Sequence, residues 1–184
     1  RRLEARQRTD AQGAEITALT GAEIARLARE VKALGVESVA VSLIHSYLNG
    51  DHETRIGRGL EGVVPFVALS HQLNPEPREY ERTNSTAMNA ALMPLVARYL
   101  KRLVDRIGSQ TGLHMFHSAG GMASAASISS RPLALALSGP AAGVAAAASV
   151  ARRLNLDRVI SFDMGGTTTD VSVIVDGKVQ IDSN

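Results

Sequence analysis

The stretch "SFDMGGTTTDVSVI", residues 161–174, decides the fold of this chain because it places a glycine turn between two apolar, β-branched runs. The flanking runs, residues 158–163 and 168–175, predict two buried strands. The turn therefore joins strand to strand. The Walker phosphate loop is different, because it leads into the N-terminus of a helix and needs a lysine.

The residues of this turn suit a phosphate group. Gly165 and Gly166 lack a Cβ, so consecutive backbone amides can face inward and form a nest for a tetrahedral anion, to which threonine hydroxyls add neutral donors. Asp163 would repel a bare phosphate, so its position at the strand end predicts a divalent cation that both groups share. The alternative is a purely structural hairpin closed by Gly-Gly, with the threonines serving as strand formers.

Bulk composition excludes several classes of protein. The chain has 184 residues, of which 45% are hydrophobic, enough for a folded core. Its net charge of +2 is small and its arginines are scattered, so a nucleic-acid partner is disfavoured. The apolar stretches are interrupted and rich in alanine, which predicts no membrane span, and the charged N-terminal residues do not resemble a secretory signal. The absence of cysteine fits a cytoplasmic location.

The first third of the sequence predicts a helix followed by a βαβ unit. Thr20 and Glu23 form a capping box, and apolar residues then recur at helical spacing until Gly35. Two nearly continuous apolar runs, 38–44 and 63–70, flank a short helix near 52–61, which predicts parallel strands covered on both faces. Pro65 argues for an edge strand.

The remainder of the sequence predicts helices alternating with short strands. The chain should be helical after "NPEP", residues 74–77, and apolar residues keep a helical period from Leu92 up to Gly108. Pro94 predicts either a kink or two helices that meet near residue 93. Residues 112–121 predict a short strand that ends in a glycine turn. A helix of small residues, 140–154, should pack closely through Gly139 and Gly143, and Asp176-Gly177 predicts a hairpin turn.

Two polar groups have competing interpretations. The "REYER" segment, residues 78–82, is either an interdomain or substrate-facing ion network or a solvated helix start. His114 and His117 flank a short strand, but the local sequence supplies no carboxylate for a metal site, so a structural role is the preferred interpretation.

Four motifs, taken in order, resemble one family. They are "REYERTNSTAMNAALMPLVARYLKRL", "HSAGGMAS", "LALSGPAAGV" and "FDMGGTTTDVSVI". Their order is that of the hydantoinase A, 5-oxoprolinase and acetone carboxylase family, within the actin, sugar-kinase and heat-shock ATPase superfamily. The resemblance extends from about residue 20 onward. It implies an α/β fragment of an actin-like (ribonuclease H-like) two-lobe fold with mixed sheets and packed helices.

The resemblance also implies ATP and Mg²⁺ as cofactors and a cyclic amide or imide, of the hydantoin or 5-oxoproline type, as substrate. ATP would phosphorylate the carbonyl oxygen before hydrolysis, and a second, hydantoinase B-like subunit is a possible partner. The implied site consists of Asp163, the metal ligand, together with Gly165, Gly166, Thr167, Thr168, Thr169 and Asp170. The implied domains are the end of the N-terminal lobe (1–72), a helical connection (73–157) and the start of the second lobe (158–184).

The sequence also departs from the family pattern. The first phosphate loop and the adenosine-contacting segment are absent, so we expect a fragment that is inactive by itself. Ser118-Ala119-Gly120-Gly121 lacks the family's asparagine, and Ser138-Gly139-Pro140 offers no catalytic base. Three alternatives remain: a related ketone carboxylase subunit, a chaperone-like or regulatory ATPase, and an interaction module whose glycine turn is structural.

Overall fold

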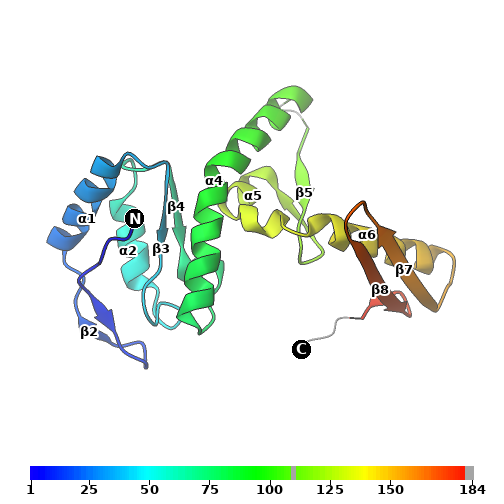
Figure 1. Ribbon diagram of the computed structural model, residues 1–184, viewed down its shortest axis with the longest axis horizontal. Helices are drawn as coiled ribbons and strands as arrows, with labels where there is room; N and C mark the ends of the chain where they lie inside the picture. Colours follow the sequence, from blue (N-terminus) through cyan, green and yellow to red (C-terminus); the bar gives the residue numbers. More distant parts are fainter. Residues whose placement is uncertain (109–110, 181–184) are drawn as a thin grey trace. The chain divides into compact units, whose positions relative to one another are not determined.

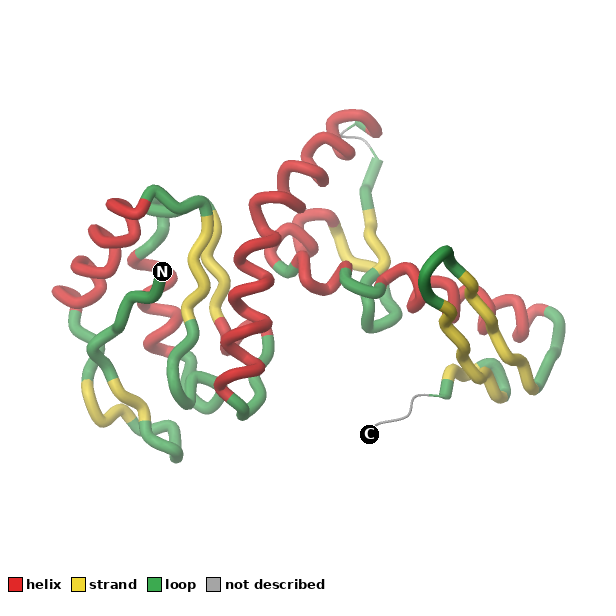
Figure 2. The backbone as a smooth tube through the Cα atoms, viewed as in Figure 1, coloured by secondary structure: helices red, strands yellow, loops and turns green. Residues whose placement is uncertain are grey.

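The computed structural model of the chain describes residues 1–108 and 111–180 (Figure 1). The chain divides into two compact units: Arg1–Ser109 with Ser129–Leu133, and Gln110–Ile128 with Ala134–Asn184. Both units contain helices and short strands, as expected for a mixed α/β protein (Figure 2). In the part of the chain that the structure describes, no helix combines the length and the apolar character needed to cross a membrane.

The first helix of the first unit, α1 (Gly21–Leu34), has the predicted ends. The Thr20 hydroxyl accepts a hydrogen bond from the Glu23 amide at 3.2 Å, and Gly35 ends the helix in the left-handed conformation with a φ of 60°. Leu27 and Val31 form its buried face. The capping box and the glycine stop are therefore confirmed.

The Glu23 carboxylate also accepts hydrogen bonds from the Arg26 guanidinium at 2.6 and 2.9 Å and from the Arg6 amide at 2.8 Å. The hydrogen bonds from Arg26, followed by the one from the Arg6 amide, lower the pKa of Glu23 from 4.5 to about 2. The folded state therefore prefers the ionised carboxylate more strongly than the unfolded chain does. The resulting stabilisation is present above pH 4.5 and is lost as the pH falls toward 2.

We expect Glu23→Gln to destabilise the chain at about pH 6 and to be nearly indistinguishable from the wild type near pH 2. Urea unfolding across this pH range measures the difference. The matched control is Glu30→Gln, which removes an exposed carboxylate that contacts the same arginine at 2.6 Å. A difference between Glu23→Gln and the wild type that does not change with pH would contradict the prediction.

A two-stranded parallel sheet lies at the centre of the first unit. Strands β3 (Ser38–Val41) and β4 (Phe66–Leu69) pair with Ser38 opposite Phe66, and helix α2 (Asp51–Gly59) connects them. One sheet face packs on α1 and α2 through a core cluster that includes Leu27, Val31, Val41, Ile56, Leu60 and Val64. The other face carries Ala68 and packs on α4 through Ala90 and Met93 (Figure 1). The predicted βαβ unit, with strands covered on both faces, is confirmed.

Both strands are shorter than the apolar runs that predicted them. Pro65 lies just outside β4, which fits its lack of an N–H group. β3 ends at Val41, because the amide of Leu43 donates to the Glu53 carboxylate at 2.8 Å and its carbonyl accepts from Arg82 at 2.9 Å. Side chains thus replace the strand ladder at this end of the sheet.

Helix α4 (Glu79–Ile107) is a single helix of 29 residues that contains Pro94. Of the two alternatives at Pro94, two helices that meet near residue 93 are wrong, and a kink within one helix stays a prediction. Pro94 removes one backbone hydrogen bond from a long helix, and this loss is offset by packing, because Ala90, Met93 and Pro94 are all buried. Elements of the first part of the chain that the sequence patterns did not predict are β1 (Arg8–Thr9), β2 (Glu15–Thr17) and α3 (Ser70–Leu73). Farther along, β6 (Met122–Ser124), α5 (Ala125–Ser130) and η1 (Pro132–Leu135) were not predicted either.

The second unit contains two antiparallel sheets and helix α6. Strands β5 (His114–Phe116) and β6 (Met122–Ser124) form a hairpin. Short helices α5 (Ala125–Ser130) and η1 (Pro132–Leu135) lead to α6 (Ser138–Arg153), which packs on β7. Strands β7 (Arg158–Met164), β8 (Thr169–Val175) and β9 (Lys178–Val179) form the second sheet in that order. The turn at Asp176-Gly177 has φ values of 50° and 69°, which confirms the predicted hairpin.

Candidate functional site

The glycine turn connects two antiparallel strands, as predicted. β7 and β8 pair from Arg158 opposite Val175 up to Met164 opposite Thr169, so the turn itself consists of residues 165–168. The Gly165 amide donates to the Thr168 carbonyl at 2.9 Å and closes the turn. Every residue of the predicted site is exposed to solvent: Asp163, Gly165, Gly166, Thr167, Thr168, Thr169 and Asp170.

The ladder places two carboxylates side by side. Asp163 and Asp170 are directly opposite in the register and therefore project from the same sheet face. Neither makes an ion pair with any residue that the structure describes. Like charges in this arrangement repel, and a bound cation would relieve the repulsion. The donor set, two carboxylates with exposed hydroxyls, fits a hard divalent cation such as Mg²⁺.

The backbone of the turn differs from the predicted nest. Neither Gly165 nor Gly166 adopts the left-handed conformation, which an anion nest requires at alternate residues. The Gly165 amide is also already used by Thr168. The amides of Gly166, Thr167 and Thr168 have no acceptor among residues 1–108 and 111–180. Any anion contact at this turn would therefore use these later amides and the threonine hydroxyls.

The two glycines leave open space beside the turn, and neither uses the left-handed backbone conformation that glycine favours. A Cβ at Gly166 would meet no protein atom within 4 Å, and one at Gly165 would lie 3.5 Å from the Thr168 carbonyl oxygen. Alanine would therefore fit both positions in the chain itself. The absence of side chains at the turn leaves room for a bound group to approach the backbone.

Helix α6 passes close to Asp163 at a glycine. A Cβ at Gly143 would lie 3.7 Å from the Asp163 Oδ2 atom, so the small residue allows the helix to approach this carboxylate. Gly139 differs, because a Cβ there would meet nothing within 4 Å. Close packing through Gly143 is thus confirmed, and close packing through Gly139 is wrong.

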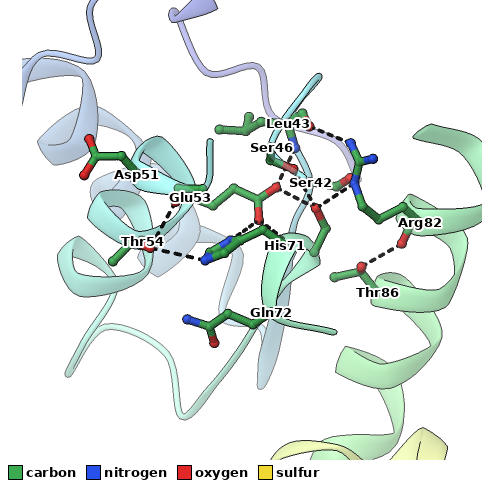
Figure 3. A network of polar contacts seen from close by, with 12 residues as sticks. Ser42, Leu43, Ser46, Asp51, Glu53, Thr54, His71, Gln72, Arg82 and Thr86 are labelled. Carbon is green, nitrogen blue, oxygen red and sulfur yellow. Dashed lines mark hydrogen bonds and ion pairs between the residues drawn. The ribbon is translucent and has the colours of Figure 1, made fainter. Parts of the chain in front are cut away.

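One residue of the "REYER" segment, Arg82, belongs to a buried network in the first unit, whereas Arg78, Tyr80 and Glu81 are exposed as in a solvated helix start. Arg82 is fully buried, and its guanidinium donates to the Ser70 hydroxyl at 3.2 Å and to the carbonyls of Glu76 and Leu43 at 2.8 and 2.9 Å (Figure 3). Its charged group also lies 5.3 Å from the centre of the Tyr47 ring. The arginine side chain therefore connects the segment after β3, at Leu43, with the segment after β4, at Ser70.

A fully buried carboxylate, Glu53, contacts the same two segments from the opposite side (Figure 3). It accepts hydrogen bonds from the Ser70 hydroxyl at 2.7 Å, from the Leu43 amide at 2.8 Å and from both the amide and the ring of His71 at 3.0 and 2.8 Å. Ser70 thus links the buried arginine to the buried carboxylate. No local sequence pattern indicated Glu53, Ser70 or His71, because an isolated glutamate on a short helix carries no local signal of burial.

The partner of Arg82 at the helix start is Glu79, whose Oε1 lies 3.5 Å from the guanidinium. Burial raises the pKa of Glu79, but hydrogen bonds from its own amide and from the His45 amide, together with the charge of Arg82, outweigh this effect and lower the pKa below its usual value. Glu79 is therefore ionised at neutral pH, and it adds to the charge balance around the buried arginine.

The remaining candidate residues form no metal site in the part of the chain that the structure describes. Among the described residues there is no group of three or more His, Cys, Asp or Glu placed to hold a metal ion, and this includes His114 and His117. The Ser118 amide donates to the Ala134 carbonyl at 2.8 Å, and Gly120 has a φ of 82°, as a glycine turn requires. A cavity of about 840 Å³ lies in the first unit beside β3, and no residue of the predicted phosphate site lines it.

Comparison with known proteins places the chain in a family. The hydantoinase/oxoprolinase family profile matches residues 82–184, and the profile of the hydantoinase/oxoprolinase N-terminal region matches residues 1–64. An uncharacterised protein of Methanocaldococcus jannaschii is 39% identical over 179 residues, covering 95% of this chain and 26% of that protein.

Two solved structures are similar to the chain. The ATP-dependent caprolactamase from Pseudomonas jessenii superposes with a TM-score of 0.78 at 34% identity, covering 91% of this chain and 25% of that one. A nucleotide-free acetone carboxylase structure superposes with a TM-score of 0.69 at 26% identity, covering 94% and 25%. The expected fold, an α/β portion of an actin-like ATPase, is confirmed, and the chain spans about a quarter of the length of these relatives. By its sequence and its fold, this chain belongs to the hydantoinase/oxoprolinase family.

Proposed function

We propose that this chain is part of an ATP-dependent hydrolase of cyclic amides or imides, of the hydantoin or 5-oxoproline type. The observation that carries the proposal is the similarity to an ATP-dependent caprolactamase over 91% of the chain. Both that protein and the family name point to ring amides, whose carbonyl carbon is a poor electrophile. Transfer of the ATP γ-phosphoryl group to the carbonyl oxygen would release ADP and make the carbon open to attack by water. The tetrahedral adduct would then break its C–N bond, with a proton passing to the leaving nitrogen, and give an acyl phosphate. A second water would hydrolyse this acyl phosphate to the free carboxylate and inorganic phosphate.

The glycine turn would hold the nucleotide phosphates. Asp163 would bind Mg²⁺, and its ladder neighbour Asp170 would share that cation or orient water bound to it. The hydroxyls of the three threonines and the later amides of the turn would donate to phosphate oxygens. The open space at Gly166 supports this assignment, because the chain itself does not require a glycine there.

The domain roles follow from the same proposal. Residues 1–72 would end the N-terminal ribonuclease H-like lobe, residues 73–157 would connect the lobes, and residues 158–184 would begin the second lobe. A second, hydantoinase B-like subunit would complete the enzyme. The matched caprolactamase sequence is itself named as an alpha subunit, which supports such an assembly.

A related ATP-dependent ketone carboxylase subunit is the second candidate. The acetone carboxylase superposition covers 94% of the chain, which favours this alternative over a chaperone-like or regulatory ATPase of the same superfamily. The two candidate reactions share activation of a carbonyl oxygen by ATP. They differ in the second reactant, which is water in the hydrolase and a source of the carboxyl group in the carboxylase.

The test is ATP hydrolysis by the full-length protein with its copurifying subunits. We expect ADP release to rise at least about tenfold when a lactam, hydantoin or 5-oxoproline is supplied, with one ring opened for each ATP in the limit of tight coupling. ADP is measured together with the ring-opened acid by mass spectrometry. Stimulation by ketone and bicarbonate alone would favour the carboxylase, and stimulation by peptides without any small-molecule product would favour the chaperone-like reading.

A further inference from the structure

The parallel sheet of the first unit leaves the outer edge of β3 without a neighbouring strand. β3 pairs only with β4 among the strands that the structure describes. In a parallel ladder the backbone groups of alternate residues face the partner strand, so the remaining groups of β3 point away from β4. Within residues 1–108 and 111–180, no other backbone group pairs with them. This edge can therefore accept a further strand.

The cavity of about 840 Å³ follows this outer edge. Six consecutive residues, 38–43, line it, together with Leu27 and Val31 of α1 and Thr83 and Ala87 of α4. Helices α1 and α4 cover opposite faces of the sheet (Figure 1). A cavity that touches both covering helices and β3, but no residue of β4, lies beside the edge of β3 and between the two helix layers.

The length and the lining of the cavity fit an extended strand. Six residues of extended chain span about 20 Å. The lining is mainly apolar, and its only charged residues are Arg1 and Arg2. Strands of a parallel sheet are normally buried on both faces by helices, and a strand in this cavity would have α1 on one face and α4 on the other.

The outer edge of β4 has the features of an edge that stays open. Pro65 directly precedes β4, and the hollow beside this strand is lined by the charged residues Arg58 and Glu61. Proline and charged side chains are the features by which natural sheets prevent pairing at an exposed edge. β3, with the sequence SVAV, carries neither. The two edges therefore differ, and the sheet is suited to continue on the β3 side.

We propose that the outer edge of β3 binds an extended, mainly apolar strand of five or six residues, counted at about 3.3 Å per residue, from the same polypeptide outside residues 1–184. The relatives are about four times as long as this chain, which leaves ample polypeptide to supply the strand. A covalently linked strand also has a high effective concentration at the edge. Binding here is independent of the proposed reaction, because no residue of the glycine turn lines the cavity.

The first test measures hydrogen exchange of single amides in the full-length protein. We expect the four amides of β3 to exchange within about tenfold of one another, because the added strand pairs with those that point outward. The internal control is β4, where alternate amides should differ by at least about a hundredfold. Alternating rates in β3 would overturn the proposal. Protection that is lost on dilution, or that requires a second subunit, would overturn the assignment to the same polypeptide.

The second test introduces a charge into the cavity. Ala87 is exposed in this chain and lines the cavity, whereas Ala91, one helical turn farther along α4, is exposed and does not line it. With the strand bound, Ala87→Asp buries a charge, and we expect the Tm of the full-length protein to fall at least about 5 °C below that of Ala91→Asp. Equal Tm values would overturn the proposal. If Ala87→Asp does not fold, the exchange rates of the wild type decide, since they need no variant.

Discussion

Replacing Arg82 with methionine is expected to destabilise the first unit by about 3 to 5 kcal/mol, the largest effect on stability that we expect from any single substitution considered for this chain. Methionine fills a similar volume but donates no hydrogen bond. The change would leave the carbonyls of Leu43 and Glu76 without their buried donor and would remove the cation that Ser70 links to Glu53. An unpaired buried carbonyl and an uncompensated buried carboxylate are both costly.

Urea unfolding followed by tyrosine fluorescence measures this effect in the first unit specifically. The chain has no tryptophan, and its three tyrosines, Tyr47, Tyr80 and Tyr99, all lie in the first unit. The matched control is Arg98→Met on the same helix, where the arginine is 59% exposed and lies 3.4 Å from Glu37. That exposed pair is worth less than about 1 kcal/mol. Equal losses of unfolding free energy in the two variants would show that the buried network around Ser70 adds no more stability than an exposed ion pair.

Replacing Asp163 with asparagine is expected to reduce ATP turnover by about a hundredfold or more without unfolding the protein. Asp163 is exposed and faces a like charge at Asp170, so its neutralisation should change stability by less than about 0.5 kcal/mol or increase it slightly. The loss should appear in binding as well. MgATP at one hundred times its Kd stabilises a binding protein by about 2.7 kcal/mol, and Asp163→Asn should lose most of this stabilisation.

Thermal unfolding with and without MgATP, together with ADP release, measures both effects. The matched control is Asp157→Asn, an exposed aspartate in the same unit that lies outside the turn. Gly166→Ala provides a second comparison, because the fold has room for the methyl group and only a bound nucleotide would collide with it. If Asp163→Asn keeps the full shift with MgATP, the turn is a structural hairpin and the proposed site is wrong.

Local sequence patterns predicted much of the fold because the forces behind them act over a few residues. The capping contact between Thr20 and Glu23, the turn at Asp176-Gly177 and the boundaries of α6 were all predicted correctly to within about two residues. At Pro94 the sequence left one kinked helix and two separate helices open, and burial of the helix against the sheet decided for one helix by offsetting the cost of one missing hydrogen bond. The conformation at Gly165 and Gly166 was also not predicted, since glycine permits many backbone angles and specifies none.

The sequence by itself determined the family, the parallel βαβ unit and the placement of a glycine turn between two strands. Only the tertiary structure decided which polar residues are buried together: Glu53 and Ser70 are 17 residues apart, and Asn89 and Ser130 are 41 residues apart. It also decided that Asp163 and Asp170 stand opposite each other. The physical reason is that periodicity reports which face of an element is apolar, whereas the burial and pairing of a polar group depend on atoms that distant segments supply.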